Sequence, residues 1–277
     1  MRIGIFLVAF LTFLSAEIRI GTGYKSGNYF KMGEDLKKVC SNLGISVLET
    51  GGSADNLNRI LQDKIDVGFF QTDTLYSYEI LQFDKEKSLL NYNKISKSRV
   101  MAIYGIGKEF IFVLTKENRK ITKLSDLENK KVLIGSPKSG ANRTANFLRY
   151  YFSVGNWNFV EKDFDESAFY SLKNGDIDAI FLVGSRELKN LKNLPSNVII
   201  NDFYTDELQK PFGKADFDDK RLFYINSIIA VGKNREKGKK IRDCISENIV
   251  RLQTGNFSNE WKKVDIRDKN TKWYNLK

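Results

Sequence analysis

The feature that most constrains this chain is a short segment that occurs twice, at residues 20–28 (IGTGYKSGN) and 134–142 (IGSPKSGAN). Each copy follows an aliphatic run and precedes a stretch with apolar residues at helical spacing. About 45 residues further on, each is followed by an Ile-Asp pair and a second apolar run, at 65–69 and 177–181. A repeated strand, glycine loop and helix predicts two similar α/β units, each with a helix N-terminus at the end of a strand.

The rest of the chain also alternates between strand and helix patterns. Short apolar runs at 45–48 and 178–183 predict strands. Apolar residues at helical spacing predict helices at 54–61 and 241–252. This alternation favours parallel sheets with crossover helices, so we expect an α/β protein of two similar lobes.

Two long extended runs frame the second copy of the repeat. One spans about 100–115, as two apolar runs at 100–106 and 110–115, and the other spans about 222–231. Both are candidates for strands that join the lobes. Lobe 1 then holds residues 17–115 and 222–277, and lobe 2 holds residues 116–221. A hinge of two strands permits the lobes to close around a ligand.

Composition indicates an ordinary globular protein. The chain has 277 residues, of which 42% are hydrophobic and 29% are charged, and it carries a formal net charge of +11. Basic residues alternate with acidic ones, as at 85–87 and 235–237, which favours a solvated basic surface. Since the sequence has no recognition helix, zinc pattern or aromatic RNA-binding motif, we do not expect a nucleic-acid partner.

The chain contains no histidine, which excludes Ser-His and Cys-His catalysis and histidine-ligated metal sites. The glycine spacing at Gly135 and Gly140 fits a phosphate-binding NTPase loop, but Ala141 and Asn142 stand where Lys and Ser or Thr are required. No recognisable pair of carboxylates, or of nucleophile and base, is present. We therefore expect neither an enzyme nor a bound cofactor.

The two cysteines, Cys40 and Cys244, are far apart in the sequence and belong to no CxxC pattern. The sequence favours two separate buried thiols. A disulfide in an oxidising compartment stays open as the alternative, because spacing alone does not show how close the two Cα atoms lie.

The first 16 residues resemble a secretory signal peptide. Arg2 precedes an almost unbroken apolar run from Ile3 to Leu14, and Ser15-Ala16 offers a cleavage site. The run is shorter than the ~20 residues that a membrane-spanning helix needs. We expect this segment to be removed and the mature protein to reach the periplasm.

Three loops connect a strand to the start of a helix, at 21–28, 50–53 and 135–142. In open α/β sheets such loops gather at the carboxyl ends of the strands, where ligands bind. The free N–H groups and partial positive charge of a helix N-terminus favour a carboxylate or phosphate. Simple turn chemistry is the alternative, but the recurrence of Ser-Gly followed by Asn in both halves favours a clamp for a small anion.

The loops and their flanks supply the candidate ligand-binding residues. Ser53 is expected to cap its helix, and Arg143 is a candidate for a bidentate pair with a ligand carboxylate. The candidates in these loops are Thr22, Gly23, Asn28, Tyr29, Ser53, Asn56, Ser136, Ser139, Gly140, Asn142 and Arg143.

Residues 50–57 (TGGSADNL) and 66–73 (DVGFFQTD) resemble the signature of the TAXI-type extracytoplasmic solute receptors, the binding subunits of tripartite (TRAP) transporters. Gly-Thr-Gly at 21–23, followed by the aromatic pair at 29–30, matches the first loop of that family. Matches in the second lobe include Ser139-Gly140, and the resemblance covers roughly residues 18–185.

The resemblance implies a type II periplasmic-binding-protein fold with two crossover strands. It also implies a small organic anion as ligand, an amino acid or a dicarboxylate such as glutamate. The partner would be a membrane permease subunit, and the receptor is expected to be a monomer. Presentation of the solute to a sensor kinase or to an ABC transporter is the alternative. By matching position, the residues that line the cleft would be Tyr29, Ser53, Asn56, Gln71 and Ser139.

Overall fold

The computed structural model describes residues 17–80, 99–186, 188, 191, 194–202, 208 and 211–266. The expected signal peptide at 1–16 lies outside these residues. Within the described part of the chain, no helix has both the length and the apolar character needed to cross a membrane.

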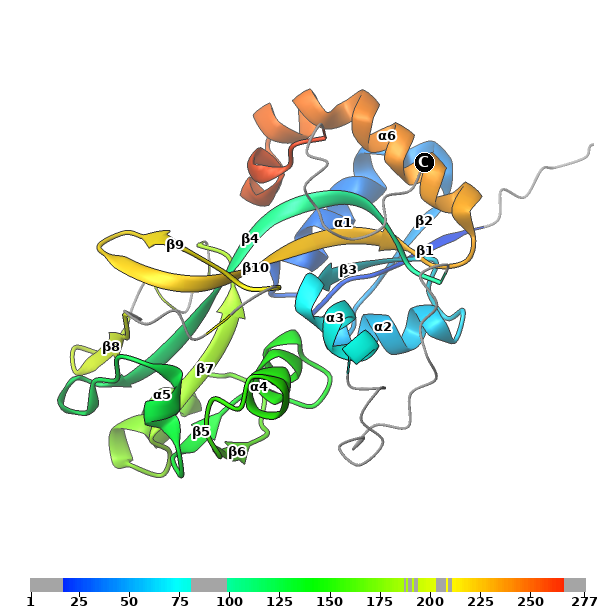
Figure 1. Ribbon diagram of the computed structural model, residues 1–277. Helices are drawn as coiled ribbons and strands as arrows, with labels where there is room; N and C mark the ends of the chain where they lie inside the picture. The colour runs from blue at the N-terminus through cyan, green and yellow to red at the C-terminus, as the bar shows by residue number, and fades with distance from the viewer. Residues whose placement is uncertain are drawn as a thin grey trace, which may run out of the picture.

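The described strands form one 10-stranded sheet in the order β2-β1-β3-β10-β4-β7-β5-β6, with β8 paired to β4 and β9 to β10. Helices cover both faces of this sheet (Figure 1). The strands are β1 (Ile18–Gly21), β2 (Ile45–Leu48), β3 (Val67–Gln71), β4 (Met101–Lys116), β5 (Lys131–Leu133), β6 (Asn158–Val160), β7 (Ala179–Gly184), β8 (Val198–Ile200), β9 (Gly213–Phe217) and β10 (Lys220–Val231). The helices are α1 (Asn28–Val39), α2 (Ser53–Leu61), α3 (Thr72–Ile80), α4 (Gly140–Tyr151), α5 (Ser167–Asn174) and α6 (Arg235–Thr254), with 3₁₀ turns at Ser41–Leu43, Glu117–Arg119, Leu124–Leu127 and Asn259–Lys263 (η5).

Two parallel groups of strands flank an antiparallel pair. Strand β1 is parallel to β2 and β3, and β5 is parallel to β6 and β7. Between the groups, the long strands β4 and β10 run antiparallel to each other and pair with β7 and β3, respectively. Figure 1 shows both strands passing from one group of elements to the other. The two crossover strands expected from the sequence are therefore present, with 100–106 and 110–115 merged into one strand.

Each group of elements has its own hydrophobic core. One core lies among the elements around β5–β7 and includes Phe112, Phe147 and Phe181. Another lies between the sheet and helices α1 and α6 and includes Ile20 and Trp261. A third, smaller core lies under α2 and α3, on the opposite face of β3 and β10. The cores lie on either side of the crossing strands, as expected for two units that each bury one apolar face.

The cysteines correct one expectation. Cys40 and Cys244 form a disulfide, with their Cα atoms 6.1 Å apart and 204 residues between them in sequence. The prediction of separate thiols was wrong because α1 and α6 pack on the same face of the sheet (Figure 1), which no local pattern indicates. The bond joins the C-cap of α1 to the middle of α6.

Two local expectations also need correction. Ser53 is the first residue of α2, and the N-cap is Gly52, whose φ of 109° is open to glycine but strained for other residues. Helix α3 begins at Thr72, directly after β3, where the sequence pattern predicted only the end of a strand. Its sequence, TDTLYSYEI, begins with three polar residues and does not gather its apolar residues on one face, so no local pattern marks the segment as a helix.

Candidate functional site

A cavity of about 220 Å³ lies where the N-termini of α1, α2 and α4 meet. Helices α1 and α2 approach it from the β1–β3 group and α4 approaches it from the β5–β7 group (Figure 1). We call it the cleft pocket. Its lining residues are Gly23, Tyr24, Gly27, Asn28, Tyr29, Met32, Gly51, Gly52, Ser53, Gln71, Glu109, Ser139, Gly140, Ala141, Val183, Gly184, Ser185, Leu188, Ser227 and Glu260.

Asn56 holds the first two loops in place from behind the pocket. Its side chain is fully buried, and Nδ2 donates to the carbonyl oxygens of Thr22 at 2.7 Å and Phe69 at 2.9 Å. Its Oδ1 accepts from the Thr50 hydroxyl at 2.8 Å. The amide thus ties the end of β1, the loop before α2 and the end of β3 together. These bonds position the N-terminus of α2 at the pocket.

The N-terminus of α4 is shaped by Ser139 and Gly140. The Ser139 hydroxyl caps the helix by accepting from the backbone N–H of Asn142 at 3.1 Å. A Cβ atom at Gly140 would lie 2.0 Å from Oε1 of Gln71, so glycine leaves room for the Gln71 side chain against the start of α4. The first backbone N–H groups of a helix have no intrahelical acceptor, and those of α4 begin at the pocket.

Glu109, on β4, is a buried carboxylate in the floor of the pocket. It is 7% exposed, and it accepts hydrogen bonds from the Tyr29 hydroxyl and from Nε2 of Gln71, the latter at 2.8 Å. Burial raises the pKa of Glu109, the two hydrogen bonds lower it, and the nearby carboxylate of Glu260 raises it. Burial also raises the pKa of Tyr29 well above its ordinary value, which keeps this hydroxyl a donor.

Glu260, in η5, brings a second carboxylate to the same pocket and is also 7% exposed. Its Oε1 accepts from Nδ2 of Asn28 at 3.0 Å and from the Ser185 hydroxyl at 2.7 Å. Its Oε2 accepts from Nζ of Lys263 at 2.9 Å. The C-terminal segment, α1 and the loop after β7 thus meet at one carboxylate.

The loops from the two sides of the pocket contact each other directly. The Tyr24 hydroxyl donates to Oδ1 of Asp163 at 2.7 Å and lies 3.1 Å from the Ser136 hydroxyl. The backbone N–H of Asp55 donates to the carbonyl oxygen of Lys138 at 3.2 Å. These contacts bring the two groups of elements together around the pocket.

Comparison with known proteins identifies the family. The pattern of the NMT1-like family matches residues 20–241 of this chain. The chain belongs to the NMT1-like family.

Solved structures with the same fold match nearly the whole NMT1-like chain. The substrate-binding protein of an amino acid ABC transporter superposes with a TM-score of 0.53 at 14% identity, covering 89% of this chain and 96% of that one. The GluR0 ligand-binding core in complex with L-glutamate gives 0.53 at 12% identity, with 88% and 97% covered. AbpA from Streptococcus pneumoniae bound to L-arginine gives 0.52 at 13% identity, with 89% and 95% covered. The NMT1-like chain therefore has the two-lobed type II periplasmic-binding-protein fold expected from the sequence.

The structure brings most of the candidate residues of this NMT1-like chain to one place. The candidates that line the cleft pocket are Gly23, Asn28, Tyr29, Ser53, Gln71, Ser139 and Gly140. Among the described residues that line it, the motifs did not indicate Glu109, Ser185, Ser227 or Glu260. One signal was available for Glu109, because it stands beside Lys108 between two apolar runs that form one strand, and a carboxylate is seldom buried in such a strand.

The other candidates lie behind or beside the pocket. Thr22 and Asn56 are buried behind the pocket, where they hydrogen-bond to each other. The Ser136 hydroxyl lies against the hydroxyl of Tyr24. Nδ2 of Asn142 donates to the carbonyl oxygen of Gly135 at 3.2 Å and to Oε1 of Glu161 at 3.0 Å.

Arg143 also differs from its expected role. Its Nε donates to the hydroxyl of Ser77 on α3 at 3.0 Å, and it is not among the residues that line the pocket. The structure therefore places this guanidinium between α3 and α4, outside the lining of the cleft pocket.

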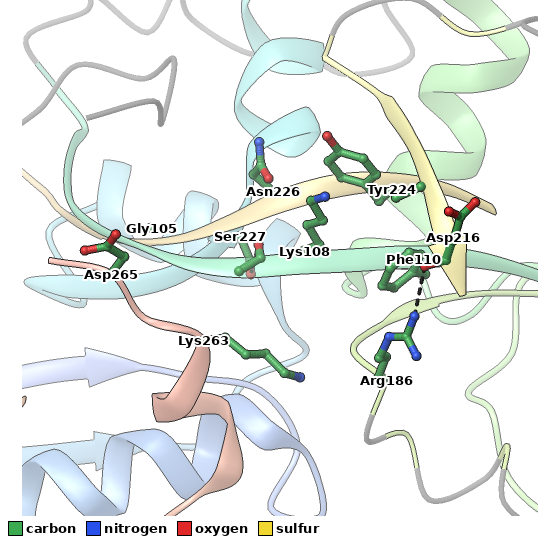
Figure 2. Close-up of a pocket in the computed structure, with 12 residues that line it drawn as sticks. Gly105, Lys108, Phe110, Arg186, Asp216, Tyr224, Asn226, Ser227, Lys263 and Asp265 are labelled. Atoms are coloured by element: carbon green, nitrogen blue, oxygen red, sulfur yellow. Dashed lines mark hydrogen bonds between the residues drawn. The ribbon is translucent and has the colours of Figure 1, made fainter. Parts of the chain in front are cut away.

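A second cavity, of about 620 Å³, lies beside β4 and β10 (Figure 2). Arg186 in its wall donates to the backbone carbonyl of Asp216 at 2.8 Å and pairs with Asp218 at 2.8 Å. Lys263, also in its wall, pairs with Glu260 of the cleft pocket at 2.9 Å. Because protein carboxylates already compensate these charges, the larger cavity is a weaker candidate for ligand binding than the cleft pocket.

Proposed function

We propose that this protein is an extracytoplasmic solute receptor that closes its two lobes around a small organic solute and delivers it to a membrane permease. The observation that carries the proposal is the pocket of about 220 Å³ at which three helix N-termini from both sides of the molecule converge. Drug-sized ligands occupy pockets of roughly 300–1,000 Å³, so this pocket suits a small metabolite.

The helix N-termini favour a carboxylate on that solute. Each contributes a partial positive charge and backbone N–H groups that have no acceptor within the helix. Glycines at positions 23, 27, 51, 52 and 140 leave the backbone accessible from the pocket. A carboxylate there receives hydrogen bonds without requiring a basic side chain.

Closure of the lobes supports the receptor function. We propose the division into lobe 1 (17–115 and 222–277) and lobe 2 (116–221), with β4 and β10 as the hinge. The contacts of Tyr24 with Asp163 and of Asp55 with Lys138 join residues of the two proposed lobes across the pocket. Since these contacts must break when the lobes separate, they couple opening of the pocket to hinge motion.

The disulfide supports export. Disulfides persist in oxidising compartments such as the periplasm and are rare where thiols are kept reduced. The bond between Cys40 and Cys244 therefore agrees with removal of residues 1–16 as a signal peptide and with a periplasmic location.

A permease of the TRAP type is the proposed partner, on the resemblance to the TAXI receptors, and the receptor acts as a monomer. The alternative is delivery to an ABC transporter, the class named for two of the similar structures. A gene for a multi-span TRAP permease next to the receptor gene would favour the first partner. A gene for a sensor kinase there would favour a sensing function.

A thermal-shift screen of mature protein (residues 17–277) tests the receptor function. The compounds are L-amino acids, mono- and dicarboxylates and, as uncharged controls, sugars and polyols. A ligand at 100 times its Kd adds about 2.7 kcal/mol to the free energy of unfolding. We expect stabilisation by a subset of the carboxylates or amino acids and none by the controls. Absence of any stabilisation across the panel would contradict the proposal.

A further inference from the structure

The charged side chains of the cleft pocket are all of one sign. Glu109 and Glu260 line it, and no lysine or arginine does so among the described residues. This acidity contrasts with the net charge of +11 for the whole chain, so it is a local property of the pocket. A site intended only for a small anion would place neither carboxylate there, because like charges repel in a buried site.

Gln71 adds an acceptor that no group in the described part of the chain satisfies. Its side chain is 4% exposed, and its Nε2 donates to Glu109, which leaves Oε1 facing the N-terminus of α4. This Oε1 is buried and has no hydrogen-bond partner among the residues that the structure describes. A buried acceptor without a donor costs about 1–3 kcal/mol, so the arrangement suits a ligand that donates a hydrogen bond there.

The two glutamates differ in how their charge is compensated. Glu260 has Lys263 as an ionic partner at 2.9 Å. Glu109 receives hydrogen bonds from the neutral side chains of Tyr29 and Gln71. Burying a carboxylate is costly unless a cation pairs with it, so Glu109 is the group that a ligand cation would stabilise most.

We propose that the solute carries a cationic amino group, which binds at Glu109, close to Glu260 and Oε1 of Gln71, while its carboxylate binds at the helix N-termini. The inference rests on the proposed receptor function and specifies the ligand class. The ligand is a small amino acid or related zwitterion, and dicarboxylates without an amino group are excluded. An ammonium has three donors to distribute over these acceptor oxygens.

Calorimetric titration of wild-type protein with matched pairs of compounds tests the cationic subsite. Each pair consists of an L-amino acid and the acid that lacks only its amino group, such as L-glutamate and glutarate, or L-norvaline and valerate. A charge-assisted hydrogen bond contributes about 1.5–3 kcal/mol, which corresponds to roughly 10- to 100-fold in Kd. We expect the amino member of the best-binding pair to bind at least about 10-fold more tightly.

Glu109→Gln isolates the proposed contact, because glutamine keeps the shape of the side chain and removes its charge. We expect it to weaken amino-acid binding by on the order of 10- to 100-fold and to leave binding of the deaminated acid unchanged or tighter. Glu236→Gln, on the outer face of α6 with 75% of its side chain exposed, is the matched control and should leave both affinities unchanged.

The possible results separate the two proposals. Equal or tighter binding of the deaminated acids by wild-type protein overturns the cationic subsite and leaves the receptor function standing. If no member of any pair binds, both proposals fail. The wild-type comparison decides the question even if Glu109→Gln does not fold, and circular dichroism and the melting temperature show whether it does.

Discussion

Thr144 on α4 donates its hydroxyl hydrogen to the fully buried carboxylate of Asp73 on α3. The other carboxylate oxygen accepts from the backbone N–H of Thr74 at 2.8 Å. Helix α3 belongs to proposed lobe 1 and α4 to proposed lobe 2, and the two helices pack against each other, so the bond joins the proposed lobes next to the cleft pocket. Burial raises the pKa of Asp73 to about 7, with a smaller contribution from Glu109, while the guanidinium of Arg143 and the two hydrogen bonds lower it.

This carboxyl makes stability depend on pH in a definite direction. The unfolded chain releases the Asp73 proton near pH ~3.9, whereas the folded protein holds it to about pH 7. The folded state therefore binds the extra proton between these values, and this stabilisation is complete below pH ~4 and lost as the pH rises through 7. Asp73→Asn, which cannot titrate, should remove this part of the decline, on the order of 2–4 kcal/mol between pH 4 and 8.

Urea unfolding of wild-type and Asp73→Asn protein at several pH values from 4.5 to 8 measures this effect. The difference between the two curves is the informative quantity, because other carboxyls titrate in both proteins. Asp219→Asn, with a side chain 82% exposed, serves as the matched control and should parallel wild type. A wild-type-like pH dependence in Asp73→Asn would refute the assignment.

The disulfide between Cys40 and Cys244 should contribute strongly to stability. It closes a loop of 204 residues and ties α1 to α6 within one hydrophobic core. Removal of a native disulfide typically costs about 2–5 kcal/mol, because the unfolded chain is no longer constrained. We expect the Cys40→Ala/Cys244→Ala double variant to unfold at lower urea concentration by that amount. Reductant should lower the melting temperature of wild type and leave that of the variant unchanged; sensitivity of both proteins would point to another cause.

Asn56→Ala should destabilise the first two loops. The change leaves the buried carbonyl oxygens of Thr22 and Phe69 without their side-chain donor, at a cost of about 2–4 kcal/mol in total. Asn158→Ala is the matched control, since its Nδ2 also donates to a backbone carbonyl, of Asn129 at 2.8 Å, but at the surface. Chemical denaturation of the three proteins gives the comparison. Equal free energies of unfolding for Asn56→Ala and Asn158→Ala would contradict the role of the buried amide.

Much of the fold follows from local sequence. The duplicated strand, glycine loop and helix predicts β1 with α1 and β5 with α4, because apolar spacing and glycine position are local properties. The same holds for β10, although its partner β4 was read as two runs. The loop pattern also predicted six of the residues that line the pocket, since loops that follow parallel strands gather at one edge of a sheet, and the family resemblance predicted a seventh, Gln71.

The rest depends on contacts between distant segments. Glu260 reaches the pocket from η5, and the disulfide joins residues 204 positions apart, so neither has a signature in its own neighbourhood. Arg143 lies next to a loop that the sequence marks correctly, yet its side chain turns toward Ser77. Because periodicity gives the face of a helix but not the partner of a side chain, the expected anion clamp did not include the two glutamates.

Gly140→Ala tests the central claim, which is that the solute binds between the lobes at the N-terminus of α4. An added methyl group would lie 2.0 Å from Oε1 of Gln71, so it should displace this buried side chain and occupy space in the pocket at the N-terminus of α4. The melting temperature without ligand reports whether the variant remains folded. The decisive measurement is calorimetric titration with the best binder of the thermal-shift screen. We predict one site per chain in wild type and at least about 100-fold weaker binding in Gly140→Ala. Unchanged affinity and stoichiometry in the variant would contradict the account.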